Sequence, residues 1–193
     1  MISDHMEKNK MQYLKDNIRN KILESAKEEF FKNGYAKGSL RTIATNAGIT
    51  VGNIYRYYDS KEALLNKILN PFYMEITKEA LKYGLIPLRQ TSLDSSLLVI
   101  EDLLIRYRQE VAILVREPVG DNIRKILLGF VSKRMVKEMS CEKPLAKILS
   151  ITFVDSLYTI LEEHIDDPKT AIRYIRKLIT IFFIQSDEIK LYE

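Results

Sequence analysis

The feature that most limits how this chain folds is a turn in its first third. Gly48 separates two short helical patterns and belongs to a residue type that commonly ends a helix. Ser39 and Thr50 stand just before the two patterns, where a hydroxyl can accept an unpaired backbone N–H of the first helical turn. The second pattern continues to Tyr57. Together these signals predict a helix-turn-helix over Ser39–Lys61.

A long helix is predicted before this motif. Apolar residues recur at helical spacing over Ile18–Phe30, so we expect a helix that begins at either Met11 or Asp16 and ends at Asn33. Gly34 then serves as its C-terminal cap. Residues 1–10 are polar and predict a frayed end.

The rest of the chain predicts further helices separated by Pro, Gly and polar turns. Asp59 and Glu62 resemble a capping box at the start of the first of these helices. Pro71, inside the same helix, either kinks it or begins a second helix. Asp167 followed by Pro168 predicts a clean helix start. We expect helices over residues 61–85, 93–110, 111–115, 122–139, 144–164 and 168–185.

These patterns predict an all-α fold of about nine helices in two domains. Residues 1–60 hold the N-terminal tail and the helix-turn-helix domain, and residues 61–193 hold a second helical domain, with the helix from residue 61 connecting them. Only 7 Gly and 5 Pro are present, which suits a chain with few turns. With 46% hydrophobic residues, the chain has enough apolar material for a sizeable core.

Cysteine usage and hydropathy suggest where the protein works. The single cysteine, Cys141, cannot form an internal disulfide, which fits a reducing cytoplasm. The longest purely apolar run, Ile181–Ile184, is far shorter than a bilayer span. We therefore expect a cytoplasmic protein without a membrane partner.

Positive charge is concentrated in the first third of the chain. Residues 1–70 hold 12 Lys/Arg against 8 Asp/Glu, whereas residues 71–193 hold 18 of each. The formal net charge of +4 therefore lies in the region of the helix-turn-helix. A phosphate backbone is bound by a local basic surface, so the distribution modestly favours DNA as a partner.

The second helix of a helix-turn-helix enters the major groove of DNA, where its N-terminal residues meet base edges. Asn can pair with adenine, and Thr and Val methyl groups can meet a thymine methyl. The residues predicted to read bases are Thr50, Val51, Gly52 and Asn53. The residues predicted to bind phosphates are Ser39, Tyr55, Tyr57 and Lys61. Arg41 and Arg56 either contact DNA or are solvated, and Tyr58 is assigned to the core.

About 50 residues of this region resemble, without a gap, the N-terminal domain of the TetR family of transcriptional regulators. The likeness is carried by Ile22-Leu23-x-x-Ala26, Phe30-x-x-x-Gly34-Tyr35, Ser39-Leu40-Arg41-x-Ile43-Ala44, Ala47-Gly48-Ile49-Thr50-x-Gly52-x-Ile54-Tyr55-x-Tyr57-Tyr58 and Ser60-Lys61-x-x-Leu64. The departures are small: Ile49, Thr50, Asn53 and Tyr58 replace the commoner Val, Ser, Thr and Phe. Asn53 falls where the family often reads a base, so it bears on the operator sequence.

The resemblance also implies roles for the C-terminal domain. Family members are mostly repressors that leave a palindromic operator when a small molecule binds, and their last two long helices pair with those of a second copy. Applied here, the dimer would form through the helices at 144–164 and 168–185, with Tyr158, Leu161, Ile172, Ile175, Ile179 and Phe182 at the interface. The candidate linings of an effector pocket are Tyr73, Tyr107, Phe130, Met135, Phe153 and Tyr158.

Two other classes of function remain as alternatives. An all-helical enzyme is disfavoured, because two histidines, one cysteine and no Gly-rich phosphate loop leave little with which to build a catalytic site. A helical adaptor that uses the helix-turn-helix for protein contacts would have no need of Gly52, Asn53 and the tyrosines after them. His164 among acidic neighbours is read as a polar helix end rather than a metal ligand, and we expect neither a metal nor a cofactor.

Overall fold

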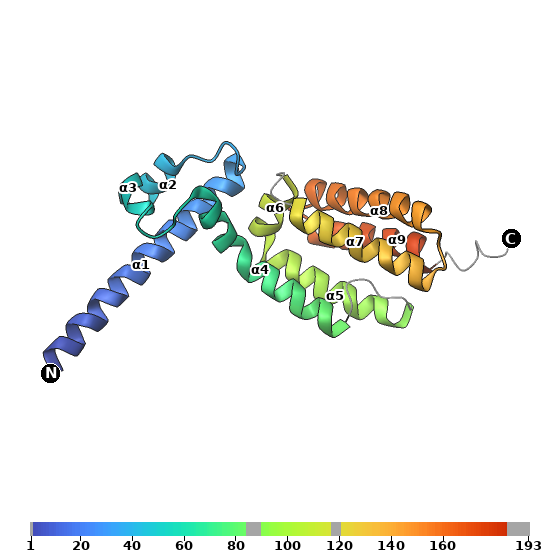
Figure 1. Ribbon diagram of the computed structural model, residues 1–193, viewed down its shortest axis with the longest axis horizontal. Helices are drawn as coiled ribbons and strands as arrows, with labels where there is room; N and C mark the ends of the chain where they lie inside the picture. Colours follow the sequence, from blue (N-terminus) through green and yellow to red (C-terminus); the bar gives the residue numbers. More distant parts are fainter. Residues whose placement is uncertain (1, 84–89, 117–120, 185–193) are drawn as a thin grey trace. The chain divides into compact units, whose positions relative to one another are not determined.

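The computed structural model describes residues 2–83, 90–116 and 121–184, and all regular structure within them is helical (Figure 1). The prediction of an all-α chain is confirmed. The α-helices are α1 (Ile2–Asn33), α2 (Leu40–Ala47), α3 (Val51–Ile54), α4 (Lys61–Tyr83), α5 (Gln90–Arg106), α6 (Arg108–Arg116), α7 (Asp121–Glu138), α8 (Lys143–Glu163) and α9 (Pro168–Ile179). A π-helical turn, Thr180–Ile184, follows α9.

The chain divides into two compact units, Met1–Tyr73 and Met74–Glu193. The division falls inside α4, which begins in the first unit and ends in the second. Pro71 lies within this single helix, so it does not begin a second one. Because proline lacks a backbone N–H, it removes one hydrogen bond from α4 at this point.

Short-range side-chain contacts fix the turns of the N-terminal unit as the sequence predicts. The Ser39 hydroxyl accepts the Thr42 N–H at 3.3 Å, and the Thr50 hydroxyl accepts the Asn53 N–H at 3.3 Å, so each caps the helix that follows. Gly48 ends α2 with φ +71°, a left-handed conformation that L side chains rarely adopt.

Three local boundaries differ from the sequence prediction. Helix α1 begins at Ile2 rather than at Met11 or Asp16, so most of the segment 1–10 is helical rather than frayed. The polar segment Met6–Lys15 is rich in strong helix formers and free of Gly and Pro. Helix α3 ends at Ile54, and the chain continues in tighter turns of the 3₁₀ type. The cap of α4 is Ser60, whose hydroxyl accepts the Ala63 N–H at 3.0 Å, rather than Asp59.

The core of the N-terminal unit joins α1, α2, α3 and the start of α4. Its fully buried side chains include Ile22, Ala26, Phe30, Ile43, Ile54, Leu64, Leu65 and Leu69. Gly38 brings the loop before α2 against this core: a Cβ there would lie 2.6 Å from the Phe30 ring. Tyr35 folds back so that its ring meets Phe30 edge to face, with centroids 5.4 Å apart.

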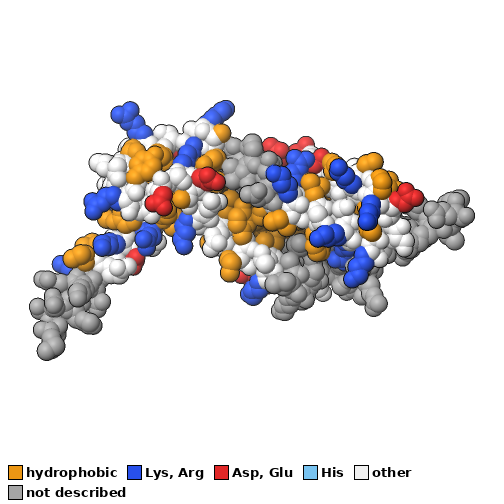
Figure 2. Space-filling view, in the orientation of Figure 1, with side chains coloured by type: hydrophobic (Ala, Val, Ile, Leu, Met, Phe, Trp, Pro, Cys, Tyr) orange, Lys and Arg blue, Asp and Glu red, His pale blue; other side chains and the backbone are white. Residues whose placement is uncertain are grey.

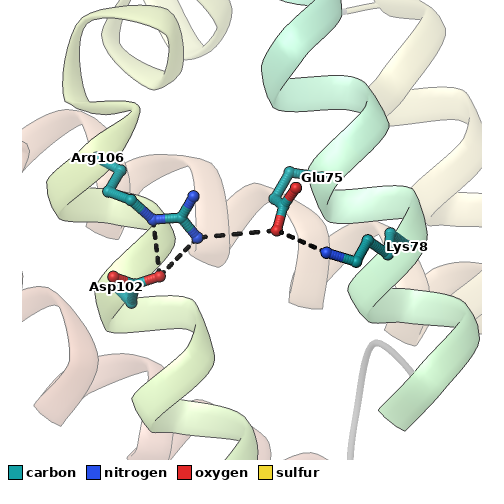
Figure 3. Close-up of polar contacts among 4 residues, drawn as sticks. All are labelled: Glu75, Lys78, Asp102 and Arg106. Carbon is teal, nitrogen blue, oxygen red and sulfur yellow. Dashed lines mark hydrogen bonds and ion pairs between the residues drawn. The ribbon is translucent and has the colours of Figure 1, made fainter.

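In the C-terminal unit, α8 packs against α6, α7 and α9, and α9 also packs on α5 (Figure 1). Ion pairs between elements reinforce these contacts: Arg124 pairs with Asp155, Arg176 with Asp94, and Arg108 with Asp166. At the C-terminal part of α4, Glu75 lies between Lys78, at 3.4 Å, and Arg106 of α5, at 3.9 Å (Figure 3). Arg106 also binds Asp102.

The helix breaks of this unit fall close to the predicted positions. Helix α5 ends at Arg106 and α6 starts at Arg108, a few residues before the expected boundary. Asp167 caps α9 by accepting the Thr170 N–H at 3.1 Å, with Pro168 in the first turn, as expected. Helix α5 begins at Gln90, three residues before the expected start at Leu93. Residues 84–89 and 117–120, which include most of the two predicted connections on either side of α5 and α6, lie outside the described residues.

Helix α8 is unusually apolar for a helix with so much exposed surface. Within the described part of the chain it alone has the length and composition of a bilayer-spanning segment, criteria that the core helix of a soluble protein also meets. Only 22% of that stretch is buried in the chain. Leu145, Ile148 and Ile151 are among its exposed side chains.

Candidate nucleic-acid interface

The N-terminal end of α3 is accessible, as base reading requires. Thr50 and Gly52 are exposed, and Val51 and Asn53 are half-buried. Ile54, the next residue, is buried and holds α3 on the core. The structure therefore brings the four predicted base-reading residues together on one short, exposed turn.

Gly52 has no internal reason to be glycine. A Cβ built at this position meets no atom within 4 Å, and its φ does not fall in the left-handed range. Glycine in a helix costs about 1 kcal/mol relative to alanine. No contact inside the unit therefore excludes a side chain at position 52.

Ser39 makes hydrogen bonds within the unit through both its side chain and its backbone. Its hydroxyl caps α2, and its backbone N–H donates to Oε1 of Glu29 at 2.9 Å. Glu29 is only 6% exposed, so a buried carboxylate of α1 anchors the start of α2. The Ser39 hydroxyl hydrogen is still available to a phosphate, as are the first N–H groups of α2, which have no partner within the helix.

Lys61 has contacts within the unit as well. Its Nζ donates to the Ala36 carbonyl at 3.2 Å and lies 4.7 Å from the centroid of the Tyr35 ring. The lysine thus holds the loop between α1 and α2. Its assignment as a phosphate contact remains a prediction, and a phosphate would have to draw the ammonium away from this site or share it.

The tyrosines after α3 divide by environment. Tyr55 is 51% exposed, and Tyr57 is half-buried with the Arg19 guanidinium carbon 6.0 Å from its ring centroid. Tyr58 is buried, as assigned from the sequence, and its hydroxyl has no hydrogen-bond partner. Burial raises the pKa of Tyr58, an effect partly offset by the nearby charge of Arg19. Tyr55 and Tyr57 therefore remain accessible to phosphates, while Tyr58 belongs to the core.

Sequence reasoning missed Glu29 and Arg19. Glu29 falls within the apolar row of Ile22, Ala26 and Phe30 when the helix is turned by 100° per residue, and a carboxylate in such a row signals a buried polar contact. Arg41 and Arg56 are both exposed, in agreement with either of the roles left open for them.

The six candidate linings of an effector pocket have different surroundings. Met135 and Phe153 are buried, and the Phe153 ring meets those of Phe182 and Phe183 edge to face. An arginine lies over each of three others: Arg106 over Tyr107, Arg134 over Phe130 and Arg124 over Tyr158. Tyr73 belongs to the N-terminal unit, where burial raises its pKa. An effector pocket at these residues stays a prediction.

The predicted dimer residues on α9 require correction. Ile172, Ile175 and Ile179 are 8%, 2% and 2% exposed, because this face of α9 packs on α5 and α8 of the same chain. They belong to the internal core and cannot form the main surface for a second copy. Tyr158, Leu161 and Phe182 are half-buried.

The geometry of α1 to α3 defines a helix-turn-helix domain with the exposed, capped second helix of a DNA-binding protein. Residues 22–68 match the family model described as bacterial regulatory proteins, TetR family. This unit belongs to the TetR family, as the sequence pattern predicted.

A curated relative resembles part of the chain in sequence, and solved structures share the fold of the chain. The chain is 37% identical over 51 residues to the HTH-type transcriptional regulator UidR of Escherichia coli K12, an alignment that covers 26% of each protein. A TetR-like transcriptional regulator from Rhodococcus sp. RHA1 has the same fold over 84% of this chain and 93% of its own, with a TM-score of 0.62 and 17% identity. The regulator FadR from Bacillus subtilis, solved with stearoyl-CoA, matches 86% of this chain and 97% of its own, with a TM-score of 0.55 and 19% identity.

Proposed function

We propose that this protein is a transcriptional regulator that binds specific duplex DNA in the cytoplasm through α2 and α3, and that it acts as a repressor. The fold of the N-terminal unit and its family support the proposal. The excess of Lys/Arg over Asp/Glu in residues 1–70 supplies the charge that a phosphate backbone needs.

The observation that carries the proposal is the exposed Gly52 at the start of α3. It lowers helix stability and relieves no contact inside the protein. A DNA backbone or base edge that comes close to α3 would explain it, because any side chain would occupy the space that the DNA needs. An adaptor that binds other proteins through the same helices would be under no such constraint.

The test compares Gly52→Ala with Gly129→Ala. Gly129 is an exposed glycine inside α7, and a Cβ there also meets nothing within 4 Å. Both variants should be as stable as the wild type or more stable by up to about 1 kcal/mol. Only Gly52→Ala should lose affinity, by about tenfold or more, for duplexes selected from a random library, measured by fluorescence anisotropy.

Two results would oppose the proposal. If the wild-type protein enriches no sequence and binds no duplex, the adaptor becomes the better hypothesis. If Gly52→Ala binds DNA as tightly as Gly129→Ala does, α3 does not approach DNA closely.

We further propose a homodimer through α8 and α9, which would read a palindromic operator with two helix-turn-helix units. The support is the exposed apolar face of α8 formed by Leu145, Ile148 and Ile151, together with Ile181 after α9. Exposed apolar patches of this kind commonly mark interfaces. In this arrangement the buried residues of α9, Ile172, Ile175 and Ile179, pack beneath the exposed side chains that form the interface.

The regulator would respond to a small-molecule effector held in the C-terminal unit. A structural neighbour of the same fold was solved with stearoyl-CoA, which supports a ligand-binding role for this unit without identifying the ligand. The six candidate linings named above are the residues to test. The effector would bind the form of the dimer in which the two DNA-binding units are badly spaced for the operator, and so shift the population away from DNA.

A further inference from the structure

The N-terminal part of α1 has no buried side chain among the residues whose side chains are described. From Lys10 to Lys21 every side chain is exposed or half-buried, and Ile22 is the first buried residue of the helix. Residues 2–21 extend for about 30 Å at 1.5 Å per residue. A helix without tertiary support is marginal in water, so a binding partner would stabilise this one.

One face of this extension continues the packed face of α1. Lys15 and Arg19 precede Ile22, Ala26 and Phe30 at spacings of four, three, four and four residues, which places all five on one side of the helix. In its C-terminal half this side packs on the helix-turn-helix. In its N-terminal half the same side presents two cations.

Arg19 connects this basic row to the proposed DNA interface. Its guanidinium carbon lies 6.0 Å from the ring centroid of Tyr57, a predicted phosphate contact. Arg19 also pairs with Asp16 at 3.7 Å, but both side chains are about half exposed, 47% and 50%, and such pairs are weak. The guanidinium is therefore able to exchange this partner for a phosphate.

The charge of the extension matches the same ligand. Residues 10–21 hold four Lys/Arg and one Asp. Lys and Arg side chains are spread over the visible face of the N-terminal unit (Figure 2). Exposed Leu14 lies on a different side of α1 from Lys15 and Arg19. Exposed Met11 precedes Lys15 by four residues and shares its side, so the row in line with the helix-turn-helix carries one apolar side chain followed by two cations.

We propose that the N-terminal part of α1 is a second DNA-binding surface, in which Lys15 and Arg19 bind backbone phosphates next to those held by α2 and α3. The proposal rests on the proposed DNA-binding function. It adds affinity without sequence preference, because phosphate contacts carry no base information. It also predicts that the DNA footprint of each protomer is longer than the helix-turn-helix alone would give.

The test measures how DNA affinity depends on salt. The probe is a duplex selected by the wild-type protein from a random library of about 40 base pairs, longer than two half-sites one helical turn apart. Lys15→Gln/Arg19→Gln is compared with Lys21→Gln/Lys32→Gln, which removes the same charge from exposed positions on other sides of α1. Circular dichroism and size-exclusion chromatography check that the variants keep their fold and assembly.

We expect Lys15→Gln/Arg19→Gln to lower the slope of log K against log salt by about 1.8 per protomer, or 0.9 for each lost phosphate contact. The control should keep the wild-type slope. The single variant Lys15→Gln, which leaves Arg19 in place beside the Tyr57 ring, should lower the slope by about 0.9 per protomer. This result separates a phosphate contact from an effect of Arg19 on the position of Tyr57.

Three outcomes would overturn the inference. Equal slopes for the wild type and Lys15→Gln/Arg19→Gln would show that these residues do not bind phosphates. Equal losses for the test and control variants would show a general effect of net charge. A variant that changes assembly before DNA is added would assign the extension to contact with a second copy. Failure of the wild type to bind any duplex would instead remove the proposed function, and this inference with it.

Discussion

The two units of this protein differ in how completely they bury their own apolar surface. Among the described side chains from Ile18 to Tyr73, Tyr55 is the one large hydrophobic residue that is mostly exposed, and it lies beside the proposed DNA surface. The C-terminal unit exposes large apolar side chains on every long helix it contains, among them Leu98, Ile126 and Ile148. From Ile18 to Tyr73 the first unit buries nearly all of its large apolar side chains, whereas the second has apolar surface that suits a partner or an effector.

The difference also concerns what fixes the structure. In the N-terminal unit, side chains only three residues away cap α2 and α3, and one left-handed glycine makes the turn between them. In the C-terminal unit, contacts between distant helices decide which face of each helix is internal, as for α9 on α5. The caps and the turn depend on residues that are neighbours in the sequence, whereas the packing of one helix on another depends on residues far apart in the sequence.

The largest expected effect comes from placing a charge on each face of the α8–α9 pair. Ile175→Glu buries a carboxylate in the core, at a cost on the order of 3–5 kcal/mol, and should unfold the C-terminal unit or leave it marginally stable. Ile148→Glu, at a position 60% exposed, should leave the fold intact and convert the dimer into a monomer. Urea unfolding and size-exclusion chromatography with light scattering separate the two outcomes.

Ile126→Glu on α7 is the matched control, because Ile126 is 66% exposed and lies on neither helix of the proposed interface. It should remain folded and dimeric. If Ile148→Glu also elutes as a dimer, the exposed face of α8 is not the interface. If Ile175→Glu is folded but monomeric, Ile175 belongs to the interface after all.

A moderate effect is expected from Tyr58→Phe in the core of the N-terminal unit. The Tyr58 hydroxyl is buried without a hydrogen-bond partner, and removing an unsatisfied polar group should stabilise the protein by about 1 kcal/mol. Chemical denaturation would measure the change. Tyr57→Phe, at a half-buried position, should bring no such gain, and a loss of stability in Tyr58→Phe would reveal a partner for the hydroxyl.

The smallest effect is expected at the cap of α9 and depends on pH. Hydrogen bonds from Thr170 hold the pKa of Asp167 below its usual value. A carboxyl with a lowered pKa stabilises the fold above its unfolded-state pKa, and this contribution is lost as the pH falls through the folded-state pKa. Asp167→Ala should therefore be slightly less stable than the wild type at about pH 7 and indistinguishable from it at about pH 2.5. Melting curves at the two pH values test this, and an equal difference at both would exclude the ionised cap as its cause.

The sequence was most informative where structure depends on near neighbours. The limits of α2 and α3 could be predicted from Ser39, Gly48 and Thr50. The start of α9 could be predicted from Asp167 followed by Pro168. At Ser60 the prediction chose the wrong cap by one residue, because Asp59 is an equally good capping residue type.

It was harder to predict which face of each helix is buried and which groups or molecules it contacts. The apolar pattern of α9 identifies a helix but not the helices that cover it, so Ile172 and Ile175 were assigned to a second copy although α5 and α8 of the same chain bury them. The place of Glu29 in the apolar row of α1 indicates a buried carboxylate, but the row does not identify its partner, a backbone N–H ten residues away. The predicted DNA and effector contacts involve molecules outside the chain and await the experiments above.

The contact between Glu29 and the Ser39 N–H has a kinetic consequence. An amide that precedes the first residue of a helix normally exchanges its hydrogen with solvent within the time of a short labelling pulse. This one donates to a carboxylate of α1 that is 6% exposed, so its hydrogen should exchange slowly and only when this contact opens. The rate of deuterium uptake at this one amide should therefore report how often the contact between α1 and the start of α2 opens, and tight binding of DNA should lower that rate.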